Sequence, residues 1–530
     1  MSYNRLTGFN VLPICGKVLG RYRVGGLPRG SDVSVTALFT LVRRSRACRL
    51  AGGALLLACA LTACTVGPFY KKPNVTPPSA WRETDTGATV TGPGAQAAEA
   101  VPVWPESQWW LGFNSPQLDD LMSQAQKAND DLAAAIARVR EADAQVRIAG
   151  APLFPSLDVT GTATRERAKP ASAPPGTPAS TFNQFAAQAG ASYELDFWGK
   201  NLATRRSASY TAQATRYDRA TVELTVMTSV ATTYFQALEN HDRLEVAQQD
   251  LATAQEVLKD LKTELSVGVI NALDVAQQET TVAVLSASIP PLAQQFRQSV
   301  NALAVLTGRT PQELEFPGGT LTGLSEPQVR PGLPSELLAR RPDVASSEAQ
   351  LRAANADIQA ARAAFFPSID LTADGGFVST ALSTLITPAN RVFSLSGQVA
   401  QQIFAGGAIT GKYQLTKARY SELLADYHKT VLTAFGDVEN ALVALQQTAD
   451  QYQRQQEAVT TARRAYDFTQ TQLHAGTVNV LTVLNTQSAL FSAQDALVQV
   501  RFAHLQALVQ LYSALGGGWQ RTHVEQRYPS

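Results

Sequence analysis

The feature that most constrains this chain is a short turn that occurs twice, each time between two long helical patterns. The first copy covers residues 265–275 around Gly268, and the second covers residues 473–484 around Gly476. The two glycines are therefore 208 residues apart. Because glycine readily adopts the positive φ that ends a helix, each turn predicts the tip of a helical hairpin. A long internal repeat of this kind constrains the architecture before any single residue does.

The repeat extends to the segments that precede the hairpins. Residues 154–160 and 366–372 share the pattern Phe, Pro, Ser, aliphatic, Asp, aliphatic, Thr, at a distance of 212 residues. We therefore expect both halves to have the same order of helix, β-hairpin and long helical hairpin. The predicted divisions are an N-terminal extension with a signal peptide (1–63), a lipidated extended segment (64–110), the first repeat (111–317), a linker (318–334), the second repeat (335–520) and a C-terminal tail (521–530).

Alternation of apolar and polar residues predicts four β-strands. In the first strand, for example, Leu157 and Val159 alternate with Asp158 and Thr160, so that one face is apolar and the other polar. Aromatic residues towards the strand ends are typical of a transmembrane β-barrel, although the alternation alone favours a soluble hairpin with one buried face. The strands are expected at residues 157–164, 185–197, 368–378 and 391–404, with a loop over residues 168–181 between the first two.

Heptad spacing predicts long helices that pack on partner helices. Apolar residues recur at alternating intervals of three and four over residues 244–265 and again over residues 431–452. A helix over residues 411–475 would be about 100 Å long, far longer than a helix of a globular domain. Shorter helices are expected over residues 116–149 and 338–365, and Pro290 and Pro291 are expected to interrupt and kink the helix that returns from the first tip.

Composition and spacing exclude several classes of protein. The net charge is +1, so no strong field attracts nucleic acid. All four cysteines lie at or before Cys64, which excludes disulfide frameworks and thiolate metal sites from the rest of the chain. The five histidines do not form pairs at metal-ligand spacing. We find no nucleophile–base pair or phosphate loop and therefore expect neither an enzyme nor a cofactor.

The N-terminal part carries an export signal. Four arginines between residues 43 and 49 precede an apolar run over residues 50–63 that is too short for a permanent membrane span. The run leads into Leu-Thr-Ala-Cys at residues 61–64, which resembles a bacterial lipobox. We expect Cys64 to become the first mature residue and to carry lipid, and the alternative is an ordinary signal peptide that contains a cysteine. Residues 1–41 do not resemble an n-region, and we interpret them as the result of a mis-assigned start codon.

The number of strands predicts an assembly. Four strands cannot close a barrel, since the smallest single-chain outer-membrane barrels have eight, and open sheet edges are not tolerated in lipid. If the strands span a membrane, several chains must share one barrel, and three identical chains would supply twelve strands. The helical hairpins would then stack into a tube that continues the barrel.

Several short motifs occur in a fixed order along residues 64–520: at residues 64–68, 70–73, 109–110, 338–344 and 363–369, at the Gly476 turn and at residues 514–519. Together they resemble outer-membrane efflux lipoproteins of the TolC-like superfamily, the NodT family of OprM-like channels. The resemblance implies a mainly α-helical homotrimer with a 12-stranded transmembrane β-barrel in the outer membrane and coiled-coil hairpins that form an α-barrel in the periplasm. It also implies a periplasmic membrane-fusion adaptor, an inner-membrane RND-type pump and outer-membrane lipid as partners, without nucleic acid.

The turn after Gly476 departs from that family. Relatives place inward carboxylates about six and nine residues after the tip glycine, where this chain has Thr482 and Asn485. Leu481 remains as an apolar constriction with these two polar residues beside it. Because neutral rings bind cations less well than carboxylates, we expect a weaker cation preference and a weaker block by divalent cations. Asp274 at the other tip resembles a carboxylate that links neighbouring tips, although a helix cap explains it equally well.

These expectations describe a passive conduit. We expect the outer-membrane channel of a tripartite efflux pump, which carries drugs or other toxic small molecules from the periplasm to the exterior. The adaptor is expected to contact the exposed grooves around Gly268, Asp274 and Gly476, and spreading of the tips is expected to open the channel. The alternatives are the channel of a protein or siderophore secretion system and a structural periplasmic lipoprotein without a pore.

Overall fold

A computed structural model describes residues 70–82, 104–169, 174, 176–329 and 332–521. The chain divides into two units, Met1–Ala63 and Cys64–Ser530, and every described residue belongs to the second unit. The predicted signal peptide, the predicted lipid attachment at Cys64 and all but the first residue of the predicted tail lie outside the described residues.

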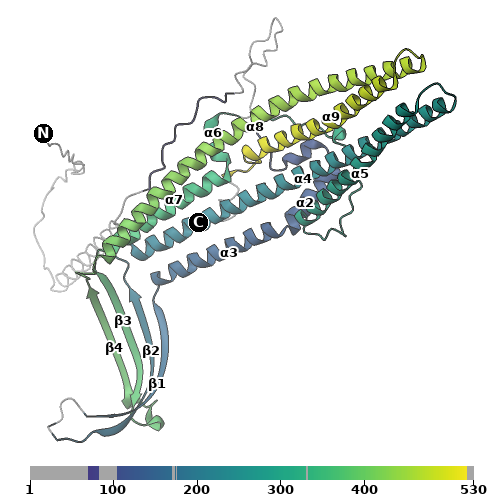
Figure 1. Cartoon of the computed structure of the whole chain (residues 1–530). Coiled ribbons are helices and arrows are strands. Elements are labelled where there is room, and N and C mark those ends of the chain that lie inside the picture. Colours follow the sequence, from purple (N-terminus) through teal and green to yellow (C-terminus); the bar gives the residue numbers. More distant parts are fainter. Residues whose placement is uncertain (1–69, 83–103, 170–173, 175, 330–331, 522–530) are drawn as a thin grey trace, which may run out of the picture. The chain divides into compact units, whose positions relative to one another are not determined.

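Two copies of one series of elements make up the second unit (Figure 1). The two long helices have 67 residues each and the two returning helices have 35 each, which confirms the predicted internal repeat. The first copy contains α2 (Pro116–Ala128), α3 (Asp130–Gly150), β1 (Ser156–Ala168), β2 (Ser180–Glu194), α4 (Lys200–Ser266) and α5 (Ala272–Leu306). The second contains α6 (Pro334–Arg340), α7 (Pro342–Ala363), β3 (Ser368–Ser379), β4 (Arg391–Ala400), α8 (Ala408–His474) and α9 (Val480–Ala514). Short 3-10 helices lie at η1 (Trp109–Phe113), η2 (Ala151–Leu153), η3 (Leu321–Gly323), η4 (Leu382–Thr384) and η5 (Pro388–Asn390).

The four strands form one antiparallel sheet in the order β1-β2-β3-β4. Across the sheet, Val159 pairs with Ala189, Ala189 pairs with Gly375, and Gly375 pairs with Phe393. Because side chains alternate with a period of two, this register gathers the apolar sets of all four strands on one face. The predicted apolar and polar faces are therefore confirmed, and each face is continuous across the sheet.

The sheet is open on its apolar face and at both edges. Leu157 and Val159 on β1 are 80% and 85% exposed, and Phe393 and Leu395 on β4 are 90% and 82% exposed. β1 and β4 each pair with one neighbour only, so each presents a row of backbone groups without a strand partner. Unpaired edges and a large apolar face both require a cover, which the described part of the chain does not supply.

The strand ends differ from the prediction. β1 and β2 extend to the pair Ala168–Ser180, so the hairpin reaches into the segment predicted as a loop. β2 ends at Glu194 rather than at Phe197, and β4 ends at Ala400 rather than at residue 404. The extent of backbone pairing determines where each strand ends, and the alternation of side chains does not reveal that extent.

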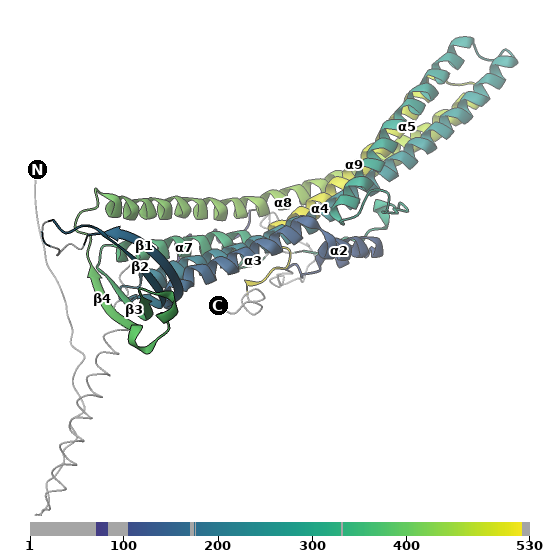
Figure 2. The same ribbon diagram turned by 90° about the horizontal axis from the view of Figure 1, so that it is seen from below.

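Each long helix is about 100 Å long and packs antiparallel to the helix that returns from the tip. The predicted apolar seam over residues 244–265 is buried or half-buried at every heptad position, which fits the packing of α4 on α5. Figures 1 and 2 show the α4–α5 hairpin and the α8–α9 hairpin running together to their tips, away from the sheet.

Pro290 and Pro291 do not interrupt α5, so the expected break in this helix is wrong. A proline has no N–H, and the carbonyls of Ser286 and Ala287 therefore lose their helical donors. All four of these residues are exposed in the chain, so water can satisfy the two carbonyls and the helix continues.

The helix predicted over residues 116–149 is instead two helices, α2 and α3, separated at Asn129. The Asn129 Oδ1 accepts a hydrogen bond from the Leu132 N–H at 3.1 Å, and Asp130 follows in the first turn of α3. These are the features of a helix start. The Asn129 Nδ2 donates to the carbonyl of Leu306 at 2.9 Å, and this carbonyl belongs to the last residue of α5. The break thus supplies a donor to a helix end that has no helical partner.

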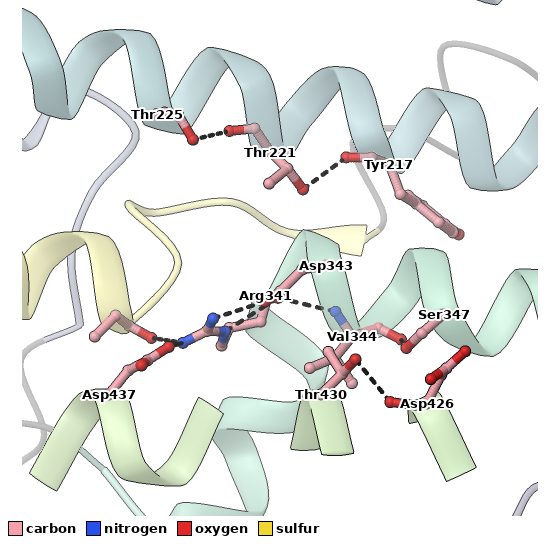
Figure 3. A network of polar contacts seen from close by, with 11 residues as sticks. Tyr217, Thr221, Thr225, Arg341, Asp343, Val344, Ser347, Asp426, Thr430 and Asp437 are labelled. Carbon is pink, nitrogen blue, oxygen red and sulfur yellow. Dashed lines mark hydrogen bonds and ion pairs between the residues drawn. The ribbon is translucent and has the colours of Figure 1, made fainter. Parts of the chain in front are cut away.

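The helix predicted over residues 338–365 is also broken, at Arg341 between α6 and α7. The Arg341 guanidinium binds the Asp343 carboxylate with its Nε at 3.0 Å and its Nη2 at 2.6 Å (Figure 3). Its Nη1 donates to Asp437 on α8 at 3.0 Å and to the carbonyl of Ala514 at 3.2 Å. Ala514 is the last residue of α9. Arg341 therefore supplies a hydrogen-bond donor to the end of α9, as Asn129 supplies one to the end of α5.

A glycine after each returning helix completes this arrangement. Gly308 follows α5 and Gly516 follows α9, both with a positive φ. A Cβ on Gly516 would lie 2.0 Å from the carbonyl oxygen of Arg340, and a Cβ on Gly308 would lie 2.3 Å from that of Ala128.

Pro342 is the local cause of the break at Arg341, because a proline favours the first turn of a helix and disfavours a helical conformation of the residue before it. We call the Asn129–Leu306 and Arg341–Ala514 contacts the helix joints.

The largest hydrophobic clusters lie beside the helix joints. The rings of Trp109 and Tyr512 stack with centroids 5.1 Å apart, and Phe113 meets Phe235 edge-on at 5.0 Å. These four aromatic residues join η1, α4 and α9 in one cluster that includes parts of α2 and α5. Because several aromatic side chains are buried here, the part of the helical region beside the helix joints is the most strongly stabilised.

The described N-terminal segment, residues 70–82, has no helix or strand but is firmly attached to the second repeat. Trp81 is 3% exposed and donates from its Nε1 to the carbonyl of Gly332 at 2.7 Å. The Lys72 Nζ lies 3.3 Å from the buried carboxylate of Glu348 on α7. An ion pair and a buried aromatic side chain therefore fix this segment on the helices.

We expect Gly516→Ala to lower the stability of the protein by at least about 2 kcal/mol, because the new Cβ meets a backbone carbonyl and φ is +88°. Gly436→Ala is the matched control: Gly436 lies within α8 with open space around it, and alanine there is expected to be neutral or to stabilise by up to about 1 kcal/mol. Thermal unfolding followed by circular dichroism would compare the two variants, and equal unfolding temperatures would contradict the assignment of the helix joint.

Candidate functional site at the hairpin tips

The two hairpin tips have the same backbone geometry. Gly268 has φ +79°, and its N–H donates to the Leu265 carbonyl at 3.0 Å. Gly476 has φ +70°, and its N–H donates to the Leu473 carbonyl at 2.9 Å. In each turn the next N–H reaches one residue further back, which gives a Schellman motif. Both glycines therefore end helices as the sequence predicts.

An asparagine begins the returning helix at each tip, but the capping differs. Asn271 and Asp274 form a reciprocal capping box, in which each side chain accepts a hydrogen bond from the backbone N–H of the other. At the second tip, Asn479 accepts from the Thr482 N–H at 3.0 Å and from the Thr482 hydroxyl at 2.7 Å. Within one chain, Asp274 thus serves as a helix cap, which is one of the two roles open to it from the sequence. A link to a neighbouring tip stays a prediction.

The predicted constriction residues lie on the first turns of α9. Leu481 is 48% exposed, Asn485 is exposed, and Thr482 is half-buried because its hydroxyl binds Asn479. No charged residue occurs between Ala475 and Gln494 in the sequence. The surface that this tip offers is therefore neutral. A constriction made of these residues would need neighbouring chains, so the pore-lining role of Leu481, Thr482 and Asn485 stays a prediction.

The first tip exposes apolar side chains instead. Val267 and Val269, which flank Gly268, are each 72% exposed, and Leu273 in the first turn of α5 is 64% exposed. Exposed aliphatic residues grouped at the end of a hairpin are typical of a surface that binds another protein. Asp274 lies next to this group, so the predicted contact residues Gly268 and Asp274 belong to one surface.

A small apolar cluster joins the two hairpins near their tips. Val257 and Leu261 on α4 and Val275 on α5 pack with Val480 on α9, and all four are at least 93% buried. The tips of the two hairpins therefore form one unit in this structure. The cluster contains no aromatic residue, in contrast to the clusters beside the helix joints.

Further from the tips the contact between α4 and α9 is polar, which sequence analysis missed. The Arg243 Nε lies 2.7 Å from the Asp495 Oδ1, and the Arg243 Nη2 lies 3.3 Å from the Asp495 Oδ2. Asp250, two helical turns along α4, is only 6% exposed. Burial raises the pKa of the Asp250 carboxyl from its ordinary value of 3.8 to about 7, with a further increase from Asp495 and an opposing effect of Arg463.

One group of three potential metal ligands occurs among the described residues, at His241, Asp242 and Glu245 on α4. The Asp242 carboxylate already accepts hydrogen bonds from the Leu321 N–H at 2.9 Å and the Thr320 hydroxyl at 3.2 Å. These bonds attach η3 to α4, and they give Asp242 a structural role.

The described helices include none that combines the length and apolar character required to cross a membrane.

Comparison with known proteins relates this architecture to one family. The outer membrane efflux protein family matches residues 121–309 and 333–517. The pyoverdine export outer membrane protein OpmQ of Pseudomonas aeruginosa is 41% identical over 471 residues, which cover 88% of this chain and 96% of OpmQ. The probable efflux pump outer membrane protein TtgC of Pseudomonas putida is 32% identical over 472 residues, which cover 88% of this chain and 96% of TtgC.

Solved channels share the fold. The outer-membrane channel OprN superposes with a TM-score of 0.78 at 26% identity, covering 86% of this chain and all of OprN. The open state of the Neisseria gonorrhoeae MtrE outer membrane channel gives 0.76 at 27% identity, with 86% of this chain and 99% of MtrE covered. The repeated hairpins, the open four-stranded sheet and these matches show together that the chain belongs to the outer membrane efflux protein family, a family of channels in the bacterial outer membrane.

Proposed function

We propose that this chain forms, as a homotrimer, the outer-membrane channel of a tripartite efflux pump. The observation that carries the proposal is the sheet, whose apolar face and two edges remain uncovered in the single chain. Three copies that pair β4 of one protomer with β1 of the next would make a closed barrel of twelve strands. Closure would satisfy every edge, and the apolar face would meet lipid.

The helices support the same assembly. Leu415, Leu432 and Phe468 on α8 are 60%, 65% and 62% exposed, an unusual exposure for large apolar side chains on a long helix. Side-by-side packing of protomers would cover such residues and continue the barrel as a helical tube. Because no catalytic constellation emerged from the sequence, we propose a passive conduit whose driving energy comes from an inner-membrane pump.

We propose that a periplasmic adaptor binds the exposed tips, as the family resemblance implies, and joins the channel to an RND-type pump. The apolar surface of Val267, Val269 and Leu273 supports this assignment at the first tip, and the second tip offers Gly476 and Leu481. Binding that favours separated tips would shift the channel towards an open state.

The cargo has two candidates. Drugs and other toxic small molecules are the cargo class that the efflux relatives suggest. Siderophore export is the second candidate, because the 41% identical relative is named for pyoverdine export. Production of this chain in a Pseudomonas aeruginosa strain that lacks OpmQ would separate the two: pyoverdine in the medium would favour siderophore export, whereas restored drug resistance alone would favour drug efflux.

We also propose that Cys64 carries lipid. Tyr70, where the attached segment begins, is the sixth residue after Cys64, so the lipid would lie within roughly 20 Å of Tyr70. The Tyr70 ring lies 5.4 Å from the guanidinium carbon of Arg352, eleven residues before the end of α7 on the side of the sheet. Acyl chains at Cys64 could therefore reach the membrane surface from which the proposed barrel rises.

The trimer is tested by native mass spectrometry and electron microscopy of the detergent-extracted protein. We expect the mass of three chains and a threefold hollow tube with a helical part on the order of 100 Å long. A monomer, or a solid coiled bundle, would contradict the shared barrel and favour the alternative of a structural lipoprotein without a pore.

The lipid is tested by growth with an alkyne analogue of palmitate. We expect the mature wild-type protein to carry the label and the Cys64→Ser variant to lack it, because the attachment needs the thiol. Detection on a gel after coupling to a fluorophore gives the readout. Equal labelling of the wild type and the variant would place the lipid elsewhere, and no label on either would favour the ordinary signal peptide.

The neutral tip is tested by single-channel conductance. Asn485→Asp would introduce one carboxylate per protomer, and we expect it to increase cation selectivity and to strengthen the block by divalent cations. Asn485→Gln is the matched control, since it changes the size of the side chain without adding charge. Unchanged selectivity and block in Asn485→Asp would show that this residue does not line the pore.

A further inference from the structure

An ion pair joins the two hairpins in addition to the apolar cluster near their tips. Arg243 on α4 binds Asp495 on α9 with both carboxylate oxygens engaged, at 2.7 and 3.3 Å. Gln499, one turn further along α9, donates to Asp495 at 2.6 Å, and Glu239 lies 3.6 Å from Arg243. A two-point contact of this kind fixes the position of one helix on the other.

Asp250 opposes this attachment. It lies seven residues after Arg243 on the same face of α4, and it is 6% exposed. Among the described residues its carboxylate has neither a hydrogen bond nor an ion pair. The charged groups that act on it from the facing helices are Asp495 on α9 and Arg463 on α8. A buried carboxylate without a hydrogen bond, and with a second carboxylate nearby, destabilises the packed state when it is ionised.

Nearer the tip, a second buried polar group lacks partners. Gln487 on α9 has no exposed surface, and neither its amide oxygen nor its amide nitrogen has a hydrogen-bond partner within the described residues. Gln487 lies seven residues after Val480 on the same side of α9, the side that packs on α4. Water would therefore reach these atoms if the hairpins moved apart. The packed arrangement therefore contains groups that separation would hydrate, and this makes the contact easy to reverse.

We propose that Arg243, Asp495 and Asp250 form a pH-dependent latch between the two hairpins, in which the Arg243–Asp495 pair holds them together and ionised Asp250 drives them apart. Only one part of this proposal assumes the proposed channel function, namely that separation of the hairpins opens the periplasmic entrance. The separation itself can be measured without any assumption about transport.

The direction of the pH effect follows from the two environments of Asp250. In the packed state the carboxyl has a pKa of about 7, and after separation and hydration it would return to its ordinary value of 3.8. The packed state therefore binds the proton more tightly, so packing is favoured at acid pH and weakens as the pH rises from about 4 to 7. Between pH 6 and pH 8 the ratio of separated to packed hairpins is expected to rise about tenfold.

Thiol reactivity in the full chain measures this ratio. The sequence has no cysteine after Cys64, so Val257→Cys introduces a single thiol beyond that residue, at a position that is 7% exposed within the inter-hairpin cluster. Its rate of reaction with a water-soluble maleimide reports separation. Val269→Cys, at a position that is 72% exposed, corrects for the effect of pH on the thiol itself, and the chain without an added cysteine gives the background.

We expect the corrected rate to rise about tenfold from pH 6 to pH 8 in the Val257→Cys chain. Adding Asp250→Asn should leave the rate low at both pH values, because an amide stays neutral. Adding Asp260→Asn, which removes an exposed carboxylate from the same helix, should leave the tenfold rise intact. Adding Arg243→Gln should raise the rate at both pH values, since it removes the ion pair.

A corrected rate that does not change with pH in the Val257→Cys chain would overturn the latch, even if every other variant failed to fold. So would a tenfold rise that persists in Asp250→Asn. Conductance of the purified trimer at pH 6 and pH 8 tests the assignment to opening separately: a rise in thiol reactivity without a rise in open probability would leave the latch in place and remove its role in gating.

Discussion

The helix joints are the contacts on which the rest of the structure depends. A helix leaves its last carbonyls without helical partners, and α5 and α9 both end against other helices of the chain. Asn129 and Arg341 supply donors to these ends, and each can do so only because the helix that carries it is broken at that residue. The residue at each helix break thus supplies the hydrogen-bond donor that the end of another helix lacks. Since the same solution occurs in both repeats, it gives both hairpins the same attachment and the same starting direction.

The sheet sets a different requirement, which one chain does not meet. Its register places Val159, Ala189, Gly375 and Phe393 on one face, and nothing in the described chain covers the large apolar side chains of this face. The proposed trimer resolves this with lipid outside and strand pairing between protomers at the edges. Polar side chains on the opposite face, such as Asp374, would then line a space that water can fill.

Much of this architecture was predictable because it depends on local pattern. Period-two alternation gave the apolar face of the sheet, heptad spacing gave the long hairpins, and the repeated glycines gave both tips. The two helix breaks were missed, although Asn129 before Asp130 and Arg341 before Pro342 are recognisable helix starts. Continuous helical periodicity concealed them. The interruption expected at Pro290 was wrong because solvent can satisfy the carbonyls that a proline frees.

The candidate site, too, has features that the sequence predicts and features that it does not. The turn geometry at Gly268 and Gly476 followed from sequence, because a helix end and an asparagine cap are local features. The Arg243–Asp495 pair joins residues 252 positions apart in the chain, and no pattern within either helix announces it. The burial of Asp250 likewise depends on a helix from the other repeat. Tertiary contacts of this kind require a structure.

Stability is graded along the hairpins, and the gradient bears on how such a molecule could open. Beside the helix joints the contacts are large aromatic clusters, with Trp109 stacked on Tyr512. Near the tips they are a cluster of four buried aliphatic residues that includes Val480, a small cluster that contains Tyr466 and Phe491, an ion pair, and buried polar groups without partners among the described residues. The returning helices have 35 residues, so the tips lie about 50 Å from the helix joints. At that distance a small change of direction at a joint moves a tip far, and the weak contacts there are the ones that yield first. In the proposed trimer, separation of the tips would therefore open the entrance while the joints and the sheet keep their structure.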